Sequence, residues 1–175
     1  VGHNITSGFS KPAPNVVLYH ADCMDGFGAA WALWKRFPKA EYIPVKHGQP
    51  PPSSFDNKHV LMVDFSYERK VIEEINKAAA SFQILDHHVT AQTALDGLPY
   101  AYFDMKKSGA VLAWEWVRQE PPPWLLLYIQ DKDLWEWRLP KSREISAALA
   151  SYPFDFEIWE ALDQKMLEIE GRAIL

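Results

Sequence analysis

The stretch VVLYHADCMDGFGAA, residues 16–30, carries the features from which the fold of this chain is inferred. Its first four residues form a short apolar run, which is typical of a buried strand. Polar and small residues follow, and then Ala30, Leu33, Trp34 and Phe37 recur at the i, i+3, i+4, i+7 spacing of a helix. We therefore expect a strand that runs directly into a helix.

The same alternation of strand and helix continues along the chain. Four further runs have the length and composition of strands: EYIPVK at 41–46, VLMV at 60–63, FQIL at 82–85 and PYAYF at 99–103. Pro44 confines the first of these to a sheet edge or a bulge, and residues 71–79 carry a second helical stripe. The repetition predicts a Rossmann-like α/β domain with a mainly parallel sheet and helices on both faces.

The second half of the chain has a more helical pattern, with stripes at 110–117, 124–130 and 154–169, the last ending near Gly171. From these patterns we expect three segments. They are a flexible N-terminal segment over residues 1–15, a folded domain over 16–152 and a C-terminal helix over 153–175.

Composition limits the classes of partner. The 175 residues are 48% hydrophobic, enough for one buried core, and 18 Lys and Arg against 23 Asp and Glu give a net charge of −5, which disfavours long duplex nucleic acid. Apolar runs stay well short of the roughly 20 residues that cross a bilayer, so no membrane partner is expected. The lone Cys23 and a start without a signal-peptide pattern favour a cytoplasmic location.

Three predicted strands each run into side chains that can bind a metal. His20 follows the first strand, Asp64 follows the strand at 60–63, and Asp86, His87 and His88 follow the strand at 82–85. Because parallel strands present their carboxyl ends at one edge of the sheet, we expect these side chains to converge. The alternative for each residue taken singly is a helix cap, a turn residue or a buried histidine with an ordinary partner.

Further carboxylates are available to the same edge. Asp22 and Asp25 follow the first strand, and Asp131 and Asp133 end an apolar helical segment. Carboxylates with imidazoles and no thiolate suit Mn²⁺, with Mg²⁺ as an alternative. Four or more carboxylates exceed what one ion needs, so we expect two ions.

Four segments, HADCMDG, VDFS, ILDHH and YIQDKD, occur in the order of the motifs of the DHH phosphoesterase family. From about Val16 to Trp137 the chain resembles the catalytic domain of that family. The resemblance implies hydrolysis of phosphodiester or phosphoanhydride bonds with two Mn²⁺ or Mg²⁺ ions. It also implies a small phosphorylated substrate, a nucleotide or a short oligonucleotide, and makes 153–175 a link to the second, Gly-rich domain that members usually carry.

The resemblance also implies roles for individual residues. His20 and Asp22 would hold one ion, Asp25, His87 and Asp131 the other, and Asp64 would bridge them. The spacing from Asp22 to Asp25 departs from several branches of the family, so which of the two binds directly stays open, and Asp133 competes with Asp131. Residues expected to act beside the ions are Asp86, which would orient an imidazole, and the phosphate contacts His88, Gly26, Ser108 and Lys132.

Several residues have a plainer interpretation. Ser108 also fits an ordinary helix cap, and Cys23 is expected to be a small packing residue. Trp135 and Trp137 fit core packing better than base stacking, and His47 and His59 are expected to face solvent. Two alternatives to an enzyme remain: a regulatory domain that binds nucleotide or metal without turnover, and a fragment that is inactive without its second domain. The sequence does not indicate an oligomeric state.

Overall fold

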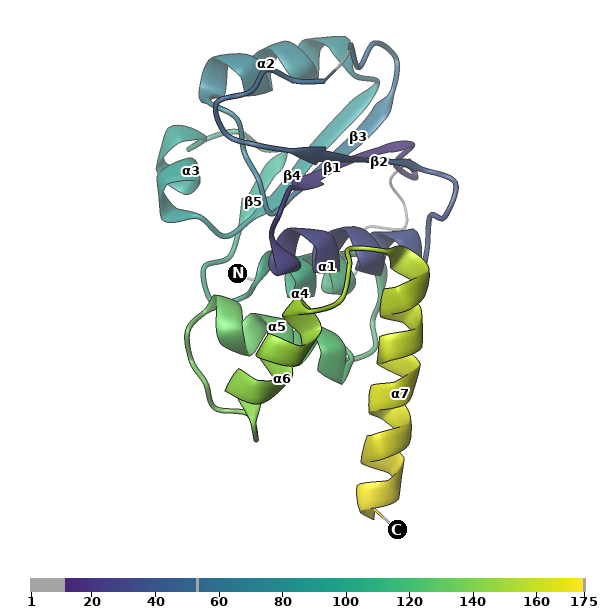
Figure 1. The fold of residues 1–175 in the computed structure, drawn as a ribbon. Helices are drawn as coiled ribbons and strands as arrows, with labels where there is room; N and C mark the ends of the chain where they lie inside the picture. Colours follow the sequence, from purple (N-terminus) through teal and green to yellow (C-terminus); the bar gives the residue numbers. More distant parts are fainter. Residues whose placement is uncertain (1–11, 53, 175) are drawn as a thin grey trace.

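The computed structural model describes residues 12–52 and 54–174 of the chain, with side chains up to residue 169. The strands in this part are β1 (Val16–His20), β2 (Glu41–Val45), β3 (His59–Val63), β4 (Ser81–Asp86) and β5 (Ala101–Phe103). The helices are α1 (Met24–Trp34), α2 (Arg69–Ala78), α3 (Val89–Ala94), α4 (Gly109–Val117), α5 (Trp124–Asp133), α6 (Ser142–Ala150) and α7 (Phe156–Ile174). Figure 1 shows their arrangement.

The five strands form one sheet in the order β2-β1-β3-β4-β5, and every neighbouring pair is parallel. β2 is an edge strand, which explains why Pro44 is tolerated there. In the registry of the central strands, Tyr19 lies beside Val63 and Val63 beside Leu85. The residues that follow these three positions therefore emerge together at the carboxyl edge of the sheet.

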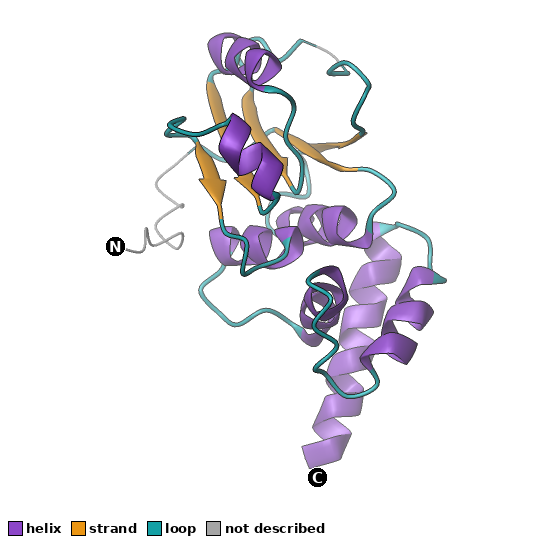
Figure 2. Ribbon diagram, turned by 90° about the vertical axis from the view of Figure 1, so that its left-hand side faces the viewer, coloured by secondary structure: helices purple, strands orange, loops and turns teal. Residues whose placement is uncertain are grey.

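Both faces of the sheet are covered by helices, which explains why its central strands are apolar without alternation. Val17, Leu61 and Leu85 pack into a core that contains residues of α1, α4, α5 and α7. Leu18 and Met62 point to the opposite face, into a core completed by Ile72 and Ile75 of α2 together with Leu95. Figure 2 shows α2 and α3 on one side of the strands and the remaining helices on the other.

The predicted fold class is confirmed: the domain is α/β, with a parallel sheet between helical layers in the Rossmann-like manner. α4 to α7 all follow the last strand, as the helical pattern of the second half predicted. Two short helices, α3 and α6, were not predicted, and α7 continues through Gly171 to Ile174. No helix of the described ranges is long and apolar enough to cross a membrane.

Described residues near both expected segment boundaries contact the folded domain. Residues 1–11 of the expected flexible segment lie outside the described residues, but Asn15 exchanges hydrogen bonds with the backbone of His59 at the start of β3. In α7, Trp159 is fully buried and meets Phe27 of α1 edge-on, with ring centroids 4.8 Å apart. The first half of α7 is therefore part of the core.

This packing generates a stability prediction. Trp159→Ala should lower the free energy of unfolding by about 3–5 kcal/mol, because it removes a large side chain from a filled core. Leu167→Ala, on the same helix but with the leucine 46% exposed, should change it by less than about 0.5 kcal/mol. Urea unfolding followed by circular dichroism measures both, and equal effects would contradict the docking of α7.

Candidate metal centre

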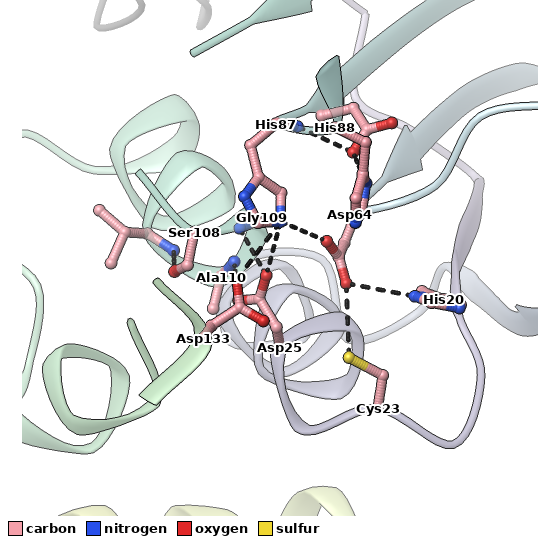
Figure 3. Close-up of polar contacts among 12 residues, drawn as sticks. His20, Cys23, Asp25, Asp64, His87, His88, Ser108, Gly109, Ala110 and Asp133 are labelled. Atoms are coloured by element: carbon pink, nitrogen blue, oxygen red, sulfur yellow. Dashed lines mark hydrogen bonds and ion pairs between the residues drawn. The ribbon is translucent and has the colours of Figure 1, made fainter. Parts of the chain in front are cut away.

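Metal-competent side chains from four segments meet at the carboxyl edge of the sheet (Figure 3). They form three groups, and within each group the potential ligand atoms all lie within 4.8 Å of one another. We call their union the ligand cluster; its members are His20, Cys23, Asp25, Asp64, Asp86, His87, His88 and Asp133. The predicted convergence of strand-end residues is thus observed for β1, β3 and β4.

His87 stands at the centre of the ligand cluster. Its Nε2 atom lies 3.0 Å from Asp64 Oδ1, 3.2 Å from Asp25 Oδ2 and 3.5 Å from Asp133 Oδ2. Burial lowers the pKa of His87, but hydrogen bonds with Asp25 and Asp64 outweigh it and raise the pKa to about 11. Three carboxylates around one nitrogen require positive charge at this point.

Asp64 connects the two sides of the ligand cluster. While Oδ1 faces His87, Oδ2 lies 3.7 Å from His20 Nδ1 and accepts a weak hydrogen bond from Cys23 Sγ at 3.7 Å. Burial raises the pKa of Asp64, but hydrogen bonds from His20 and His87 outweigh it and bring the pKa to about 2. An anionic carboxylate shared by two ligand groups matches the bridging position expected for Asp64.

The backbone of Asp64 supports its special position. Asp64 has φ +55, in the left-handed region that non-glycine residues seldom occupy and that concentrates at functional sites. The turn is held by its backbone N–H, which donates to Leu85 O at 2.9 Å. A Cβ on Gly109 would lie 2.5 Å from Asp64 Cβ, so glycine is required where α4 approaches this turn.

Asp25 joins α1 to the start of α4. Its fully buried carboxylate accepts the backbone N–H groups of Gly109 at 2.7 Å and Ala110 at 2.8 Å. The positive end of the α4 dipole adds to these bonds. Burial, followed by repulsion from Asp64, nevertheless raises the pKa of Asp25 to about 7. The sequence indicated Asp25 as a ligand but not this cap, because nothing in it relates residue 25 to residue 109.

Of the two carboxylates near the end of α5, Asp131 and Asp133, only one points toward the ligand cluster. Both oxygens of Asp131 are occupied by the backbone N–H groups of Arg138 at 2.9 Å and Leu139 at 3.1 Å, so this carboxylate closes the loop after α5. Asp133 reaches the ligand cluster instead. The prediction of Asp131 as a ligand is therefore replaced by Asp133, the carboxylate that lies in the ligand cluster.

Asp22 does not join the ligand cluster either. Its side chain is 75% exposed and pairs with Lys46 beyond the end of β2. The neighbouring Cys23, expected only to pack, instead brings its sulfur to His20 and Asp64. Burial raises the pKa of the Cys23 thiol to about 12. Cys23 and not Asp22 therefore lies near His20 among the atoms that could hold a metal ion.

The adjacent histidines bond to different carboxylates. His88 Nδ1 bonds to Asp86 Oδ1 at 2.6 Å, and this bond raises the pKa of His88. Asp86 is buried and also accepts from Ser66 Oγ and from the backbone of His87, both at 2.8 Å. Asp86 thus orients an imidazole, the role expected for it, while His88 keeps 45% of its side chain exposed.

Two of the expected phosphate contacts are buried instead. A Cβ on Gly26 would lie 2.2 Å from the carbonyl oxygen of His20, so this glycine lets α1 pack against the end of β1. Ser108 is fully buried and caps α4 by accepting from the N–H of Val111 at 3.3 Å. The assignment of Gly26 and Ser108 to phosphate is therefore corrected to packing and capping, whereas Lys132 does line an open cleft.

Two clefts flank the ligand cluster. The larger, of about 530 Å³, borders Asp25 and Asp133, and we call it the Asp133 cleft. The smaller, of about 240 Å³, borders His88 and His47. His47 is exposed, as expected, and its ring also stacks on Phe65 at 4.4 Å and lies 5.8 Å from His20.

The aromatic residues after α5 and the remaining histidine also have defined surroundings. Trp135 is 69% exposed, so core packing is wrong for it, whereas Trp137 is partly buried beneath Arg143, at 4.3 Å. His59 bonds to Ser81 Oγ at 2.8 Å at the opposite, amino edge of the sheet, away from the ligand cluster.

The two carboxylates of α5 provide a matched test of the site. Asp133→Asn should weaken Mn²⁺ binding by about 10- to 100-fold, because it removes a charged donor from the ligand cluster. Asp131→Asn should leave Mn²⁺ binding within about twofold and lower the free energy of unfolding by about 1–3 kcal/mol, because a buried acceptor is lost. Calorimetric titration and urea unfolding give the two readouts, and the reverse pattern would restore Asp131 as the ligand.

Comparisons with known proteins support the fold and leave the chemistry open. No protein-family model matches the chain. It is 35% identical over 179 residues to Uncharacterized protein R106 of Acanthamoeba polyphaga mimivirus, covering 91% of this chain and 42% of that protein. An uncharacterized protein from Helicobacter pylori G27, known from a crystal structure, shares the fold with a TM-score of 0.58 at 15% identity, over 70% of this chain and 44% of that one. The chain thus spans about two-fifths of the length of its viral relative.

Proposed function

We propose that this chain is a metal-dependent phosphoesterase of the DHH type, which hydrolyses phosphodiester or phosphoanhydride bonds with two divalent ions. The observation that carries the proposal is that the Asp64 carboxylate belongs to two groups of potential metal ligands. One of its oxygens faces His87 and the other faces His20, so a single buried carboxylate belongs to two groups of metal-competent atoms.

The donor set fits a pair of divalent cations. Asp25, Asp64, His87 and Asp133 would hold one ion, and His20 with Asp64 the other, with the sulfur of Cys23 near the second position. Carboxylates and imidazoles suit Mn²⁺, and Mg²⁺ is an alternative. The three carboxylates near His87 Nε2 support this assignment, because a bound cation would offset their mutual repulsion. Bound ions would supply Lewis-acid stabilisation and would lower the pKa of a water molecule, so that hydroxide would be available to attack phosphorus near neutral pH.

His88 is suited to contact the substrate. Asp86 bonds to Nδ1 of His88, so Nε2 lies on the opposite edge of a half-exposed ring at the rim of the ligand cluster. A hydrogen bond from this edge to a phosphoryl oxygen would stabilise charge that develops in the transition state. His87, by contrast, is 8% exposed and directs Nε2 into the carboxylates, which suits a ligand.

The substrate in this proposal is small. A net charge of −5 disfavours a long polyanion, and the clefts beside the ligand cluster measure about 530 and 240 Å³. These features favour a nucleotide or a short oligonucleotide. The lone Cys23 is compatible with a cytoplasmic location, which we include in the proposal.

Hydrolysis of bis-p-nitrophenyl phosphate in the presence of Mn²⁺ tests the proposal. We expect the wild-type chain to release p-nitrophenol, and His88→Ala to lower kcat by about 10²- to 10³-fold, as when one transition-state donor is removed. Calorimetry should show nearly unchanged Mn²⁺ binding for His88→Ala and impaired binding for His87→Ala.

His59→Ala is the matched control, because His59 lies at the opposite edge of the sheet with Ser81 as its partner. It should keep both Mn²⁺ binding and turnover. Equal loss of Mn²⁺ binding in His87→Ala and His88→Ala would refute the division of roles. Mn²⁺ binding without turnover on any phosphate ester or anhydride would favour the regulatory alternative.

A further inference from the structure

We infer that the Asp133 cleft is a subsite for the nucleobase of a nucleotide, with the ring of Phe154 as its stacking platform. The inference rests on the proposed function for the phosphate-handling role of the ligand cluster. It assigns a specificity role to Phe154, in the connection between α6 and α7.

The Asp133 cleft adjoins the ligand cluster directly. Asp25, Asp133 and Cys23 belong both to its wall and to the ligand cluster, and Figure 3 shows Asp25 and Asp133 next to each other. The rest of the lining comes from the turn before α1 and its first residue, from the end of α5, and from two residues after it, Ala150 and Phe154; the turn contributes Asp22. A group bound in the cleft would therefore sit beside a phosphate at the cluster.

The wall away from the carboxylates is apolar and contains a fixed aromatic ring. Phe154 stacks on Phe27 with centroids 5.1 Å apart and an interplanar angle of 11°. Trp159 meets the same ring edge-on, with centroids 6.0 Å apart. The residue is nevertheless 41% exposed and lines the cleft, so part of it remains available to a flat ligand.

The chemistry of the wall selects the kind of ligand. Met24 and Phe154 offer apolar contact, which suits a planar aromatic group. Lys132 adds one cation to a wall that also carries the carboxylates of Asp22, Asp25 and Asp133. A volume of about 530 Å³ falls in the range of small-ligand sites. An aromatic base joined to a phosphate combines these properties.

Equilibrium binding separates this inference from catalysis. In the presence of Mn²⁺, adenosine 5′-monophosphate should bind the full chain at least about tenfold more tightly than ribose 5-phosphate, which has the same phosphate without a base. Phe154→Ala should weaken binding of adenosine 5′-monophosphate by about 5- to 100-fold, the usual effect of losing one base stack, and leave ribose 5-phosphate unchanged.

Tyr152→Ala is the matched control, because Tyr152 is also 41% exposed and lies two residues from Phe154, and its side chain is not part of the cleft wall. It should retain the wild-type preference. Because Phe154→Ala also removes the partner of Phe27, Ala150→Leu provides a second variant that narrows the cleft without touching that stack. It should weaken adenosine 5′-monophosphate selectively, with Mn²⁺ binding preserved.

The outcomes distinguish the two proposals. Equal affinity of the wild-type chain for the two phosphates, or equal losses for both in Phe154→Ala, would overturn the base subsite even if hydrolysis is observed. A preference for adenosine 5′-monophosphate that depends on Phe154 would support the subsite even if the chain hydrolyses no phosphodiester.

Discussion

Three buried or partly buried carboxylates meet within 3.5 Å of one imidazole nitrogen, His87 Nε2, and much of the structure serves to make this arrangement tolerable. Like charges at such separations repel strongly where water is scarce. Each carboxylate of the group therefore needs compensation from elsewhere in the fold. Asp64 obtains it from His20 and His87, and Asp25 obtains it from two backbone N–H groups at the start of α4.

These compensating contacts bind the sheet to its helices. Asp25 lies in the first turn of α1 and accepts hydrogen bonds from the start of α4, so the two helices meet at the carboxyl edge as well as along their length. Gly26 lets α1 reach the end of β1, and Gly109 lets α4 reach the turn at Asp64. In both places a Cβ would overlap backbone or side-chain atoms, so the close approach that assembles the ligand cluster depends on glycine at these two positions.

At the same edge of the sheet, Asp86, His87 and His88 differ in their partners and exposure. Asp86 is removed from direct participation because Ser66, His88 and the backbone of His87 use its oxygens. Its bond to His88 sets the orientation of a half-exposed ring, while His87 turns inward. Under the proposed function, this arrangement divides holding of the ions from contact with phosphate. The Asp133 cleft then adds an apolar wall on the side of α5, where a substrate could extend from the cluster.

The sequence by itself determined the parallel α/β architecture and the edge at which the candidate site lies. Apolar runs of four or five residues, each followed by a metal-competent residue, indicate buried parallel strands whose ends converge, and the strands at His20, Asp64 and Asp86 do so. The sequence indicates these features because a run of neighbouring apolar residues marks a buried strand, and the carboxyl ends of parallel strands lie at the same edge of a sheet.

Tertiary structure alone decided which carboxylate of each pair enters the ligand cluster. Asp131 and Asp133 stand about 200° apart around α5, so only one can face His87, and packing of that helix against α1 selects Asp133. Asp25 rather than Asp22 points inward because it accepts hydrogen bonds from backbone N–H groups of α4, which lie more than 80 residues away in the chain. The physical reason is common to both pairs: a short-range pattern specifies that an acid is present, whereas the rotation of a helix and its distant partners specify where that acid points.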